Sequence, residues 1–429
     1  MTTLVETNRS DIETDQLLQL NRLLRALVPD NRFYADRLRE AEVVEGVSSF
    51  REFSERVPFT TKAELVEDQL ANPPFGSNLT YPLERYSRYS QTSGTKGAPL
   101  RRLDTPEDWG WMLDNWVRIL EAAGVGPEDR VYVAFSFGPF LGFWTAFEAA
   151  AKMGCLVIPG GGLSSCARLD TILEAEATVL VCTPTYAIHL GQVAREQYVE
   201  SGQTPIRTLI VSGEPGGNVP GTRQHLEVCW KGARICDHHG MTEVGPVSFE
   251  CPKKRGLLHI IESSYYAEVV DPETGDPVER GMVGELVLTT LGKAGAPVLR
   301  YRTGDLVKAV CVDPCECGRY EVGLIGGIIG RADDMVLIRG VNVYPSAVED
   351  IVRRFEEVAE YQVEVYDSIP VTEIEVRAEP IPTCADPAKL QDRLQAAFKD
   401  RLNLRVPVHL AEPGSLPRFE MKAKRWVRY

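Results

Sequence analysis

Apolar positions along the chain follow two different periods, which divide it into helical and sheet-forming parts. Leucines recur at helical spacing through 11–45, with a break at Pro29-Asp30-Asn31, and helical spacing returns from Glu107 to Ala123. Continuous apolar runs predict buried strands at 130–135, 156–159, 178–182, 208–211 and 233–236. Because helix-like stretches separate these strands, for example from Ser136 to Met153, we predict βαβ units and a mainly parallel sheet.

The pattern changes after Leu257, where short alternating segments predict a β-rich subdomain at about 250–325. A glycine-rich stretch over 326–334 follows, and glycine tolerates large changes in backbone dihedral angles. Beyond it, strand-like segments at 335–340, 362–366 and 373–378 mix with helix-like segments at 346–355 and 387–402. We therefore predict an α/β plus α+β protein, with a large N-terminal domain over 1–331, a hinge near Asp333 and a small mobile α+β domain over 332–429.

Charge and composition exclude several classes of partner. The formal net charge of −14 argues against nucleic acid, which requires a basic face. No run of about eighteen apolar residues appears, and the N-terminus lacks a basic segment followed by an apolar one. We therefore expect no membrane association, no secretion signal and a cytoplasmic location.

A loop rich in hydroxyl groups and glycine is the first candidate for chemistry. It runs through Thr92, Ser93, Gly94, Thr95, Lys96 and Gly97. Glycines allow close approach of the backbone to a ligand, and free N–H groups with hydroxyls form a concave site for anions, to which Lys96 adds a cation. The loop is a candidate to hold nucleotide phosphates, and a solvated turn is the alternative.

Polar residues also follow two of the predicted parallel strands. Ligands bind such sheets beyond the carboxyl ends of their strands, so both segments lie where a nucleotide could bind. The segments are Gly213-Glu214-Pro215 and Asp237-His238-His239-Gly240-Met241-Thr242-Glu243.

Five motifs in a fixed order resemble the adenylate-forming enzymes, most closely their phenylacetate–CoA ligase-like branch. They are the Thr92 loop, the segment 239–243, Tyr301-Arg302-Thr303-Gly304-Asp305, Gly330-Arg331-Ala332-Asp333-Asp334, and the C-terminal Pro417-Arg418-Phe419-Glu420-Met421-Lys422. The resemblance covers most of the chain. It implies ATP-dependent activation of a carboxylic acid to acyl-AMP with release of pyrophosphate, then transfer of the acyl group to CoA.

The resemblance also implies roles for residues in the large domain. The loop 92–97 would bind the β- and γ-phosphates, although its cation is displaced by two positions from the usual lysine. Thr242 would contact the α-phosphate and Glu243 would bind Mg²⁺, although a Thr-Glu pair is also a common helix start. Adenine would be lined by Gly213, Glu214 and Pro215. The nucleotide would also be bound by Asp237, His238, Gly240 and Met241. His239 stands where relatives usually have tyrosine, and could stack on adenine, titrate near the acyl carboxylate or be an ordinary hydrogen-bonded loop histidine.

Further roles follow for the remaining motifs. Asp305 would accept hydrogen bonds from the ribose hydroxyls, and Arg331 would contact ribose or phosphate. Lys422 would bridge the attacking carboxylate and the α-phosphate, with Lys424 as the rival. Gly340 would lie beside the pantetheine arm of CoA. Because Lys422 and Gly340 serve different half-reactions, the small domain would rotate between them.

Two further sets of residues are candidates for a metal and for the acid. Cys251, His259, Cys315 and Cys317 suit a closed, structural Zn²⁺ site; free thiols are the alternative, and Cys311 could replace one ligand. An aromatic acid could lie among Phe135, Phe137, Phe140, Gly142 and Phe143, although aromatic residues at such junctions are commonly core.

Two other functions remain open from the sequence. The acyl group could pass to a carrier protein or an amine instead of CoA, or the chain could be a catalytically weakened nucleotide-binding protein. A homodimer is also open, because relatives are often dimers.

Overall fold

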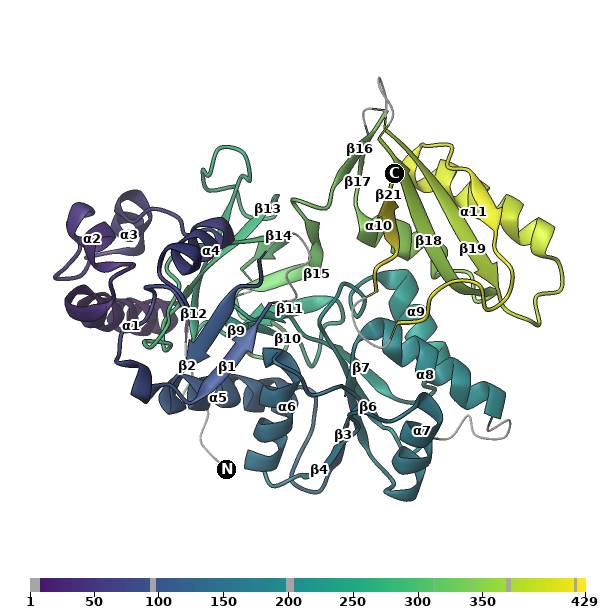
Figure 1. Ribbon diagram of the computed structural model, residues 1–429, viewed down its shortest axis with the longest axis horizontal. Helices are drawn as coiled ribbons and strands as arrows, with labels where there is room; N and C mark the ends of the chain where they lie inside the picture. The colour runs from purple at the N-terminus through teal and green to yellow at the C-terminus, as the bar shows by residue number, and fades with distance from the viewer. Residues whose placement is uncertain are drawn as a thin grey trace. The chain divides into compact units, whose positions relative to one another are not determined.

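A computed structural model describes residues 8–92, 98–197, 204–311, 313–339, 341–367, 372–419 and 423–429 (Figure 1). The chain forms two compact units. The first unit comprises Met1–Gly161 and His238–Gly327, and the second comprises Gly162–Asp237 and Ile328–Tyr429. The predicted domain boundary at 331/332 lies four residues beyond the last change of unit, and the division into domains remains a prediction. Within the described residues, no helix combines the length and apolar character that a membrane span requires.

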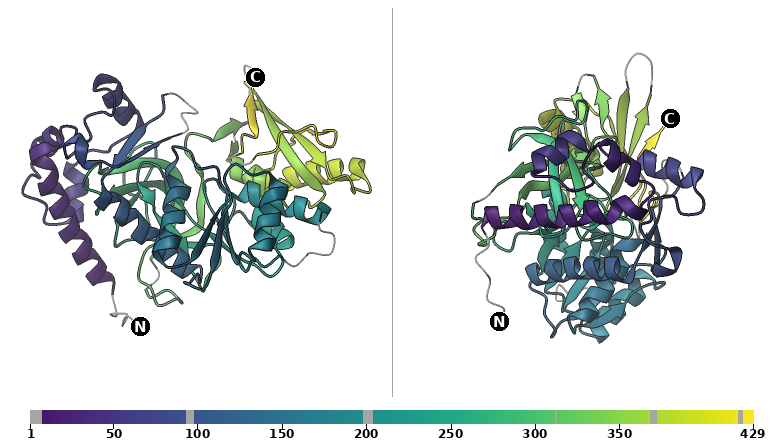
Figure 2. Two further views of the ribbon diagram at one scale, coloured as in Figure 1. Left: turned by 60° about the horizontal axis from the view of Figure 1, so that its bottom comes forward. Right: turned by 90° about the vertical axis from the view of Figure 1, so that its left-hand side faces the viewer.

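Helices of the first unit come before its larger sheet in the sequence. They are α1 (Arg9–Asp30), α2 (Ala35–Glu40), α3 (Phe50–Arg56), α4 (Lys62–Ala71), the 3-10 turn η1 (Leu83–Arg85), α5 (Pro106–Ala122) and α6 (Leu141–Lys152). Helix α1 is purple in both views of Figure 2. Gln16 ties it to the turn that leads into β12 (Tyr265–Val270), because its amide donates to the carbonyls of Glu262 and Tyr265 at 3.0 and 2.7 Å. Capping boxes at Thr61 and Thr105 fix where α4 and α5 begin.

Strands of the first unit form a hairpin, a parallel pair and a six-stranded sheet with order β10-β11-β15-β14-β13-β12. Strands β3 and β4 pair in parallel. In the larger sheet β10 with β11, β11 with β15, β12 with β13 and β13 with β14 pair antiparallel, in the region where short alternating segments predict a β-rich subdomain. The strands are β1 (Arg88–Gln91), β2 (Arg101–Asp104), β3 (Arg130–Val133), β4 (Leu156–Pro159), β8 (Gly240–Met241), β9 (Gly245–Pro246), β10 (Ser248–Glu250), β11 (Leu257–Ile260), β12 (Tyr265–Val270), β13 (Val283–Thr290), β14 (Tyr301–Val310) and β15 (Gly323–Arg331).

The second unit combines a parallel βα segment with a C-terminal α+β part. Strands β5 (Val179–Cys182), β6 (Thr208–Val211) and β7 (Arg234–Asp237) pair in parallel, as predicted. The helices that accompany them are α7 (Ser165–Glu174), α8 (Pro184–Gln197) and α9 (Pro220–Cys229). Helices α8 and α9 lie side by side (Figure 1), and the Trp230 indole that follows α9 donates to the Ala187 carbonyl at 2.9 Å.

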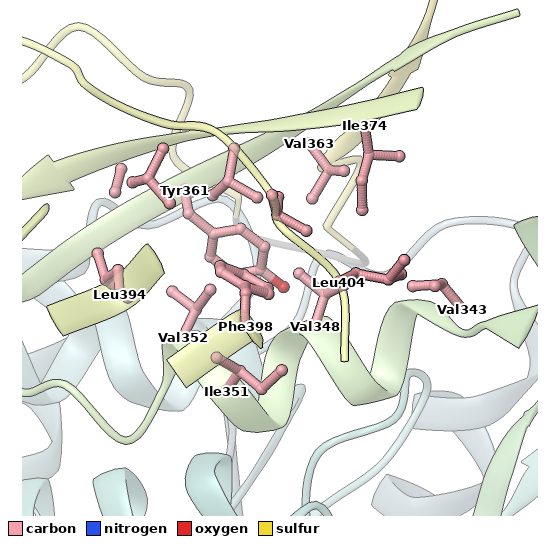
Figure 3. Packing of buried hydrophobic residues seen from close by; sticks show 14 of the residues in the cluster. Val343, Val348, Ile351, Val352, Tyr361, Val363, Ile374, Leu394, Phe398 and Leu404 are labelled. Carbon is pink, nitrogen blue, oxygen red and sulfur yellow. The ribbon is translucent and has the colours of Figure 1, made fainter. Parts of the chain in front are cut away.

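The C-terminal part has its own apolar core. A four-stranded sheet with order β20-β19-β18-β21 faces two helices across this core (Figure 3). Val363, Ile374, Ile351 and Phe398 are among its buried residues and come from both sheet and helices. The elements are β16 (Val336–Ile338), β17 (Val341–Val343), α10 (Pro345–Val352), β18 (Val358–Tyr366), β19 (Glu373–Pro380), α11 (Pro387–Leu402), β20 (Val408–Leu410) and β21 (Trp426–Arg428).

Three local features differ from the sequence expectation. Pro29 lies inside the last turn of α1, so the helix ends one residue beyond it. Helix α6 begins at Leu141, five residues after Ser136, because the segment before it is irregular. The glycine-rich stretch expected as the domain boundary is strand through Arg331, with positive φ angles of 76° and 63° at Gly326 and Gly327, and the hinge near Asp333 remains a prediction.

Candidate functional site

The predicted phosphate loop extends from the end of a β-hairpin. Thr92 follows β1, and its N–H and hydroxyl both pair with Leu100 before β2, at 2.9 and 3.0 Å. Strands β1 and β2 pair from Arg88↔Asp104 to Gln91↔Arg101. Ser93, Gly94, Thr95, Lys96 and Gly97 lie outside the described residues. The two ends of this loop are therefore held together by a continuous antiparallel ladder.

His239 and Asp305 are brought together from segments 66 residues apart. The His239 Nε2 atom lies 3.0 Å from Asp305 Oδ2, and both side chains are about nine-tenths buried. Asp305 lies in β14, where its N–H donates to the Thr303 hydroxyl at 3.0 Å. Asp305 is therefore a buried carboxylate in a strand, and His239 is a hydrogen-bonded histidine whose partner is the predicted ribose ligand.

The neighbouring His238 has a packing role. Its Nδ1 atom lies 2.7 Å from the Ser248 carbonyl, and its ring contacts Trp116 edge-on at 4.5 Å between centroids. Burial lowers the pKa of His238 to about 3, so the imidazole is neutral at physiological pH. Sequence position alone does not distinguish this core histidine from the adjacent His239.

Glu243 has a cationic neighbour that the sequence does not indicate. Its carboxylate is buried and lies 3.0 Å from the Nζ atom of Lys62, the first residue of α4. Thr242 is partly exposed beside it, and Gly240 and Met241 form β8, which pairs with β9. A buried carboxylate with one ammonium partner can exchange that partner for a divalent cation, as the predicted role requires.

In the second unit, Glu214 has two backbone partners. Its Oε1 atom accepts from the N–H of Thr185 at 2.9 Å and its Oε2 atom from the N–H of Ala423 at 2.8 Å. Gly213 adopts a φ of 97°, which favours glycine. The sequence predicts adenine contact for Gly213-Glu214-Pro215 and misses this use of the Glu214 carboxylate.

Two further predicted residues of the second unit, Asp237 and Arg331, are each the last residue of a strand. Asp237 ends β7 and packs against Gly217, where an added Cβ would lie 2.6 Å from the Asp237 Cγ atom. Arg331 ends β15, and its Nε atom lies 2.9 Å from Asp333 Oδ1. Gly340 and Lys422 lie outside the described residues.

The aromatic residues predicted for the acid pocket form two ring contacts near the start of α6. Phe135 and Phe143 are buried and stack with centroids 3.8 Å apart, and Phe137 contacts Trp144 at 4.6 Å. Phe140 is half-buried at the N-cap of α6, and Gly142 is exposed. The burial and stacking of Phe135 and Phe143 indicate that these two side chains are part of the core. Candidates for the acid pocket remain at Phe137, Phe140 and Gly142.

The four predicted metal ligands come together in the first unit. The ligand atoms of Cys251, His259, Cys315 and Cys317 all lie within 4.8 Å of one another. Cys251 Sγ lies 3.7 Å from Cys315 Sγ, and Cys317 Sγ lies 3.4 Å from His259 Nε2. Cys311 is not a member of this group.

The surroundings of this cluster orient its donor atoms. His259 directs Nδ1 to the Glu321 carbonyl at 3.3 Å, which leaves Nε2 toward the thiols. Burial lowers the pKa of His259, which favours the neutral imidazole that binds metals. The N–H of Lys254 donates to Cys251 Sγ at 3.3 Å.

Comparison with known proteins gives matches over most of the chain. Residues 92–293 match the AMP-binding enzyme family, and 340–428 match the AMP-binding enzyme C-terminal domain. The phenylacetate-coenzyme A ligase of Thermus thermophilus is 32% identical over 434 residues, 96% of this chain and 95% of the relative.

Solved structures of 2-hydroxyisobutyryl-CoA ligase are similar over 99% of this chain. The structure of its postadenylation state, in complex with an AMP adduct, has 27% sequence identity to this chain and a TM-score of 0.92, and the match covers 91% of the ligase. The thioesterification state, with AMP adduct and CoA, is 28% identical, is 91% covered and has a TM-score of 0.73. The chain therefore belongs to the AMP-forming, adenylate-forming enzymes, in their phenylacetate–CoA ligase-like branch, and it activates a carboxylic acid with ATP before forming the CoA thioester.

Proposed function

We propose that this enzyme is an aryl or arylacetic acid–CoA ligase. The match to a phenylacetate-coenzyme A ligase over nearly the whole length of both chains carries the proposal. Phe137 and Trp144, whose ring planes are tilted by 60° to each other next to Gly138, supply an aromatic surface against which a substrate ring can pack. A short 2-hydroxy acid is the second candidate, favoured by the TM-score of 0.92 with 2-hydroxyisobutyryl-CoA ligase.

An acid panel distinguishes these substrates. Arylacetic, benzoic and short 2-hydroxy acids are compared in acid-dependent pyrophosphate exchange, and the best acid is then tested for CoA-dependent release of AMP. We expect the highest kcat/KM for an aryl acid. A preference for a short hydroxy acid would select the second candidate, and exchange without CoA-dependent turnover would favour a carrier protein or amine as acceptor.

The proposed nucleotide site assigns one task to each polar group. The loop 92–97 holds the terminal phosphates, Thr242 contacts the α-phosphate, and Glu243 exchanges Lys62 for Mg²⁺. Asp305 accepts from the ribose hydroxyls, and His239, hydrogen-bonded to Asp305 at 3.0 Å, orients that carboxylate. Because ATP and CoA are both required, we place the reaction in the cytoplasm.

Two half-reactions require two placements of the C-terminal part. In the first, Lys422 bridges the acid and the α-phosphate; in the second, the region around Gly340 faces CoA, and rotation near Asp333 exchanges them. Solved structures of 2-hydroxyisobutyryl-CoA ligase in a postadenylation state and, with CoA, in a thioesterification state support two such placements.

A structural Zn²⁺ fits the Cys251, His259, Cys315 and Cys317 cluster. Two thiolates bound tetrahedrally at about 2.3 Å are expected about 3.8 Å apart. The Cys251–Cys315 separation of 3.7 Å is close to this value before any metal is added. Four protein ligands would close the site, so the ion would join β10, β11 and the turn after β14 without taking part in catalysis.

Metal analysis tests this site. We expect about one equivalent of zinc per chain, and loss of most of it in Cys317→Ser together with a lower Tm. The matched control is Cys311→Ser, which changes a cysteine outside the cluster and should retain the metal. Less than about half an equivalent in the unmodified protein would contradict a closed four-ligand site.

A further inference from the structure

The Glu214 carboxylate joins two segments that are distant in sequence. One oxygen accepts from Thr185 at the start of α8, and the other accepts from Ala423. A helix N-terminus has unpaired N–H groups and favours a negative charge, which fixes the carboxylate on α8. The position of Ala423 is therefore set relative to the loop that contains Glu214.

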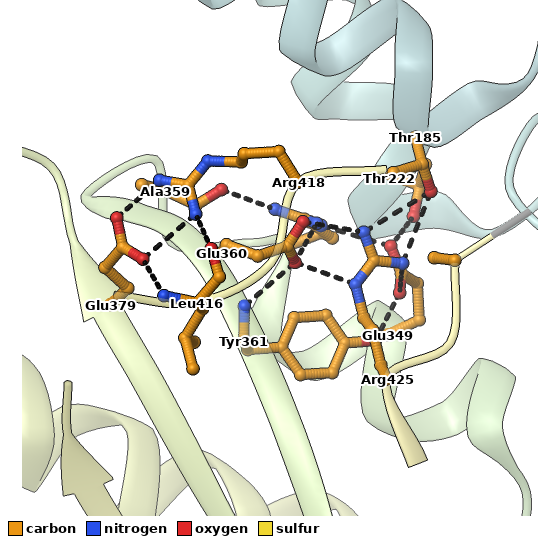
Figure 4. Close-up of polar contacts among 12 residues, drawn as sticks. Thr185, Thr222, Glu349, Ala359, Glu360, Tyr361, Glu379, Leu416, Arg418 and Arg425 are labelled. Atoms are coloured by element: carbon orange, nitrogen blue, oxygen red, sulfur yellow. Dashed lines mark hydrogen bonds and ion pairs between the residues drawn. The ribbon is translucent and has the colours of Figure 1, made fainter. Parts of the chain in front are cut away.

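Arg425 contacts the same threonine from the other side. Its guanidinium is buried, and Nη1 and Nη2 both lie 3.3 Å from the Thr185 hydroxyl oxygen (Figure 4). Thr185 thus pairs with Glu214 through its backbone and with Arg425 through its side chain. Three contacts, Ala423 with Glu214, Glu214 with Thr185 and Thr185 with Arg425, are closed into a ring by the backbone from Ala423 to Arg425; we call it the Thr185 ring.

A buried network holds Arg425 in this orientation. Nε donates to Glu360 at 2.8 Å, and Nη1 lies 3.3 Å from Glu349. Arg353 pairs with both glutamates at 3.1 Å. Burial by itself would raise the pKa of Glu349, but Arg425 and Arg353 outweigh it and lower that pKa to about 2, so the carboxylate stays ionised.

The Thr185 ring connects the C-terminal part of the second unit to the βα segment of the same unit. One of its contacts is made by Ala423, the residue that follows Lys422 in the sequence. Two more contacts cross the same boundary, from Gly221 N–H to Asp350 at 2.7 Å and from the Thr222 hydroxyl to Glu349 at 3.3 Å. If the C-terminal part rotates between half-reactions, as proposed above, the ring cannot persist in both placements. Its contacts belong to one step only.

We propose that Glu214, Thr185 and Arg425 are positioning residues for acyl-AMP formation, which set the backbone beside Lys422 and have no role in thioester formation. They act through residue 422 and need not touch the reacting atoms. The inference rests on the proposed rotation. It adds Thr185 and Arg425, which lie outside the motifs named above, and gives Glu214 a second use beside its predicted contact with adenine.

Thr185→Val tests the ring with little change of volume. It removes the hydroxyl that accepts from Arg425, and loss of a hydrogen bond to a charged group should lower acid-dependent pyrophosphate exchange by about tenfold. Thioester formation from preformed acyl-AMP and CoA should stay within about twofold of the unmodified enzyme. Thr185→Ser keeps the hydroxyl and should restore exchange.

The matched control is Thr171→Val, in α7 of the same unit. Its hydroxyl donates to Ala167 within its own helix at 2.8 Å, so neither half-reaction should change. Glu214→Gln leaves one acceptor oxygen for two N–H groups and should also lower exchange. Combined with Thr185→Val, its loss should be less than multiplicative, because both changes open one ring.

Three results would overturn the proposal. They are equal losses in both half-reactions, unchanged exchange in Thr185→Val at an unchanged Tm, or fully multiplicative losses in the double variant. Absence of exchange in the unmodified enzyme with every acid would instead contradict the proposed function.

Discussion

Lys422→Ala is expected to lower acid-dependent pyrophosphate exchange by about 10²- to 10³-fold, the usual effect of removing one preorganised charge-stabilising group. In acyl-AMP formation an anionic carboxylate attacks an anionic phosphate, so the proposed bridging ammonium acts where negative charge accumulates. In thioester formation the CoA sulfur instead attacks the uncharged acyl carbonyl carbon of acyl-AMP, a mixed anhydride, and AMP leaves, so no carboxylate has to approach a phosphate. Supplied acyl-AMP and CoA should therefore react at nearly the unmodified rate.

Lys424→Ala is the matched control for this prediction. Lys424 is exposed and two residues from Lys422, so its removal changes the same net charge at nearly the same place. Both half-reactions should remain close to normal. Comparable loss of exchange in Lys424→Ala would transfer the role to Lys424, and equal loss of both half-reactions in Lys422→Ala would show that the lysine does not act in adenylation alone.

Helices and strands were predictable from the sequence where the local pattern of apolar residues determines them. Strand β4 (Leu156–Pro159) and helix α11 (Pro387–Leu402) have the predicted bounds, because apolar runs and helical spacing are local signals. The stretch at 326–334 was expected as an irregular domain boundary, since glycine tolerates many conformations. Strand β15 instead pairs with β11 at 323–325 and continues through Arg331, a tertiary effect that no local pattern contains.

The functional residues also fall into two groups, those that the sequence identifies by their chemistry and those that only the fold brings together. Cys251, His259, Cys315 and Cys317 could be grouped from the sequence because few side chains share their chemistry. Arg353, Arg425, Glu349 and Glu360 could not, because arginine and glutamate usually lie on the surface and only the fold shows this buried pairing. Lys62 beside Glu243 was missed for the same reason.

Lys293→Met is expected to lower the free energy of unfolding by about 3–5 kcal/mol, the usual cost of removing one partner of a buried ion pair. The side chains of Lys293 and Asp104 are both fully buried and pair with each other. Asp104 ends β2, so the uncompensated carboxylate would lie at the base of the hairpin that carries the phosphate loop. Denaturant unfolding at neutral pH measures the change.

Two variants show whether the unpaired charge is the cause. Lys152→Met breaks the exposed pair with Asp114, 2.5 Å apart, and should cost no more than about 1 kcal/mol because solvent screens that pair. The double variant Lys293→Met/Asp104→Leu removes both buried charges and should recover most of the lost stability. If Lys293→Met costs no more than Lys152→Met, the buried pair does not hold the hairpin. If the double variant is as unstable as the single one, the loss comes from packing rather than from an isolated carboxylate, and the base of the phosphate loop depends on shape more than on charge.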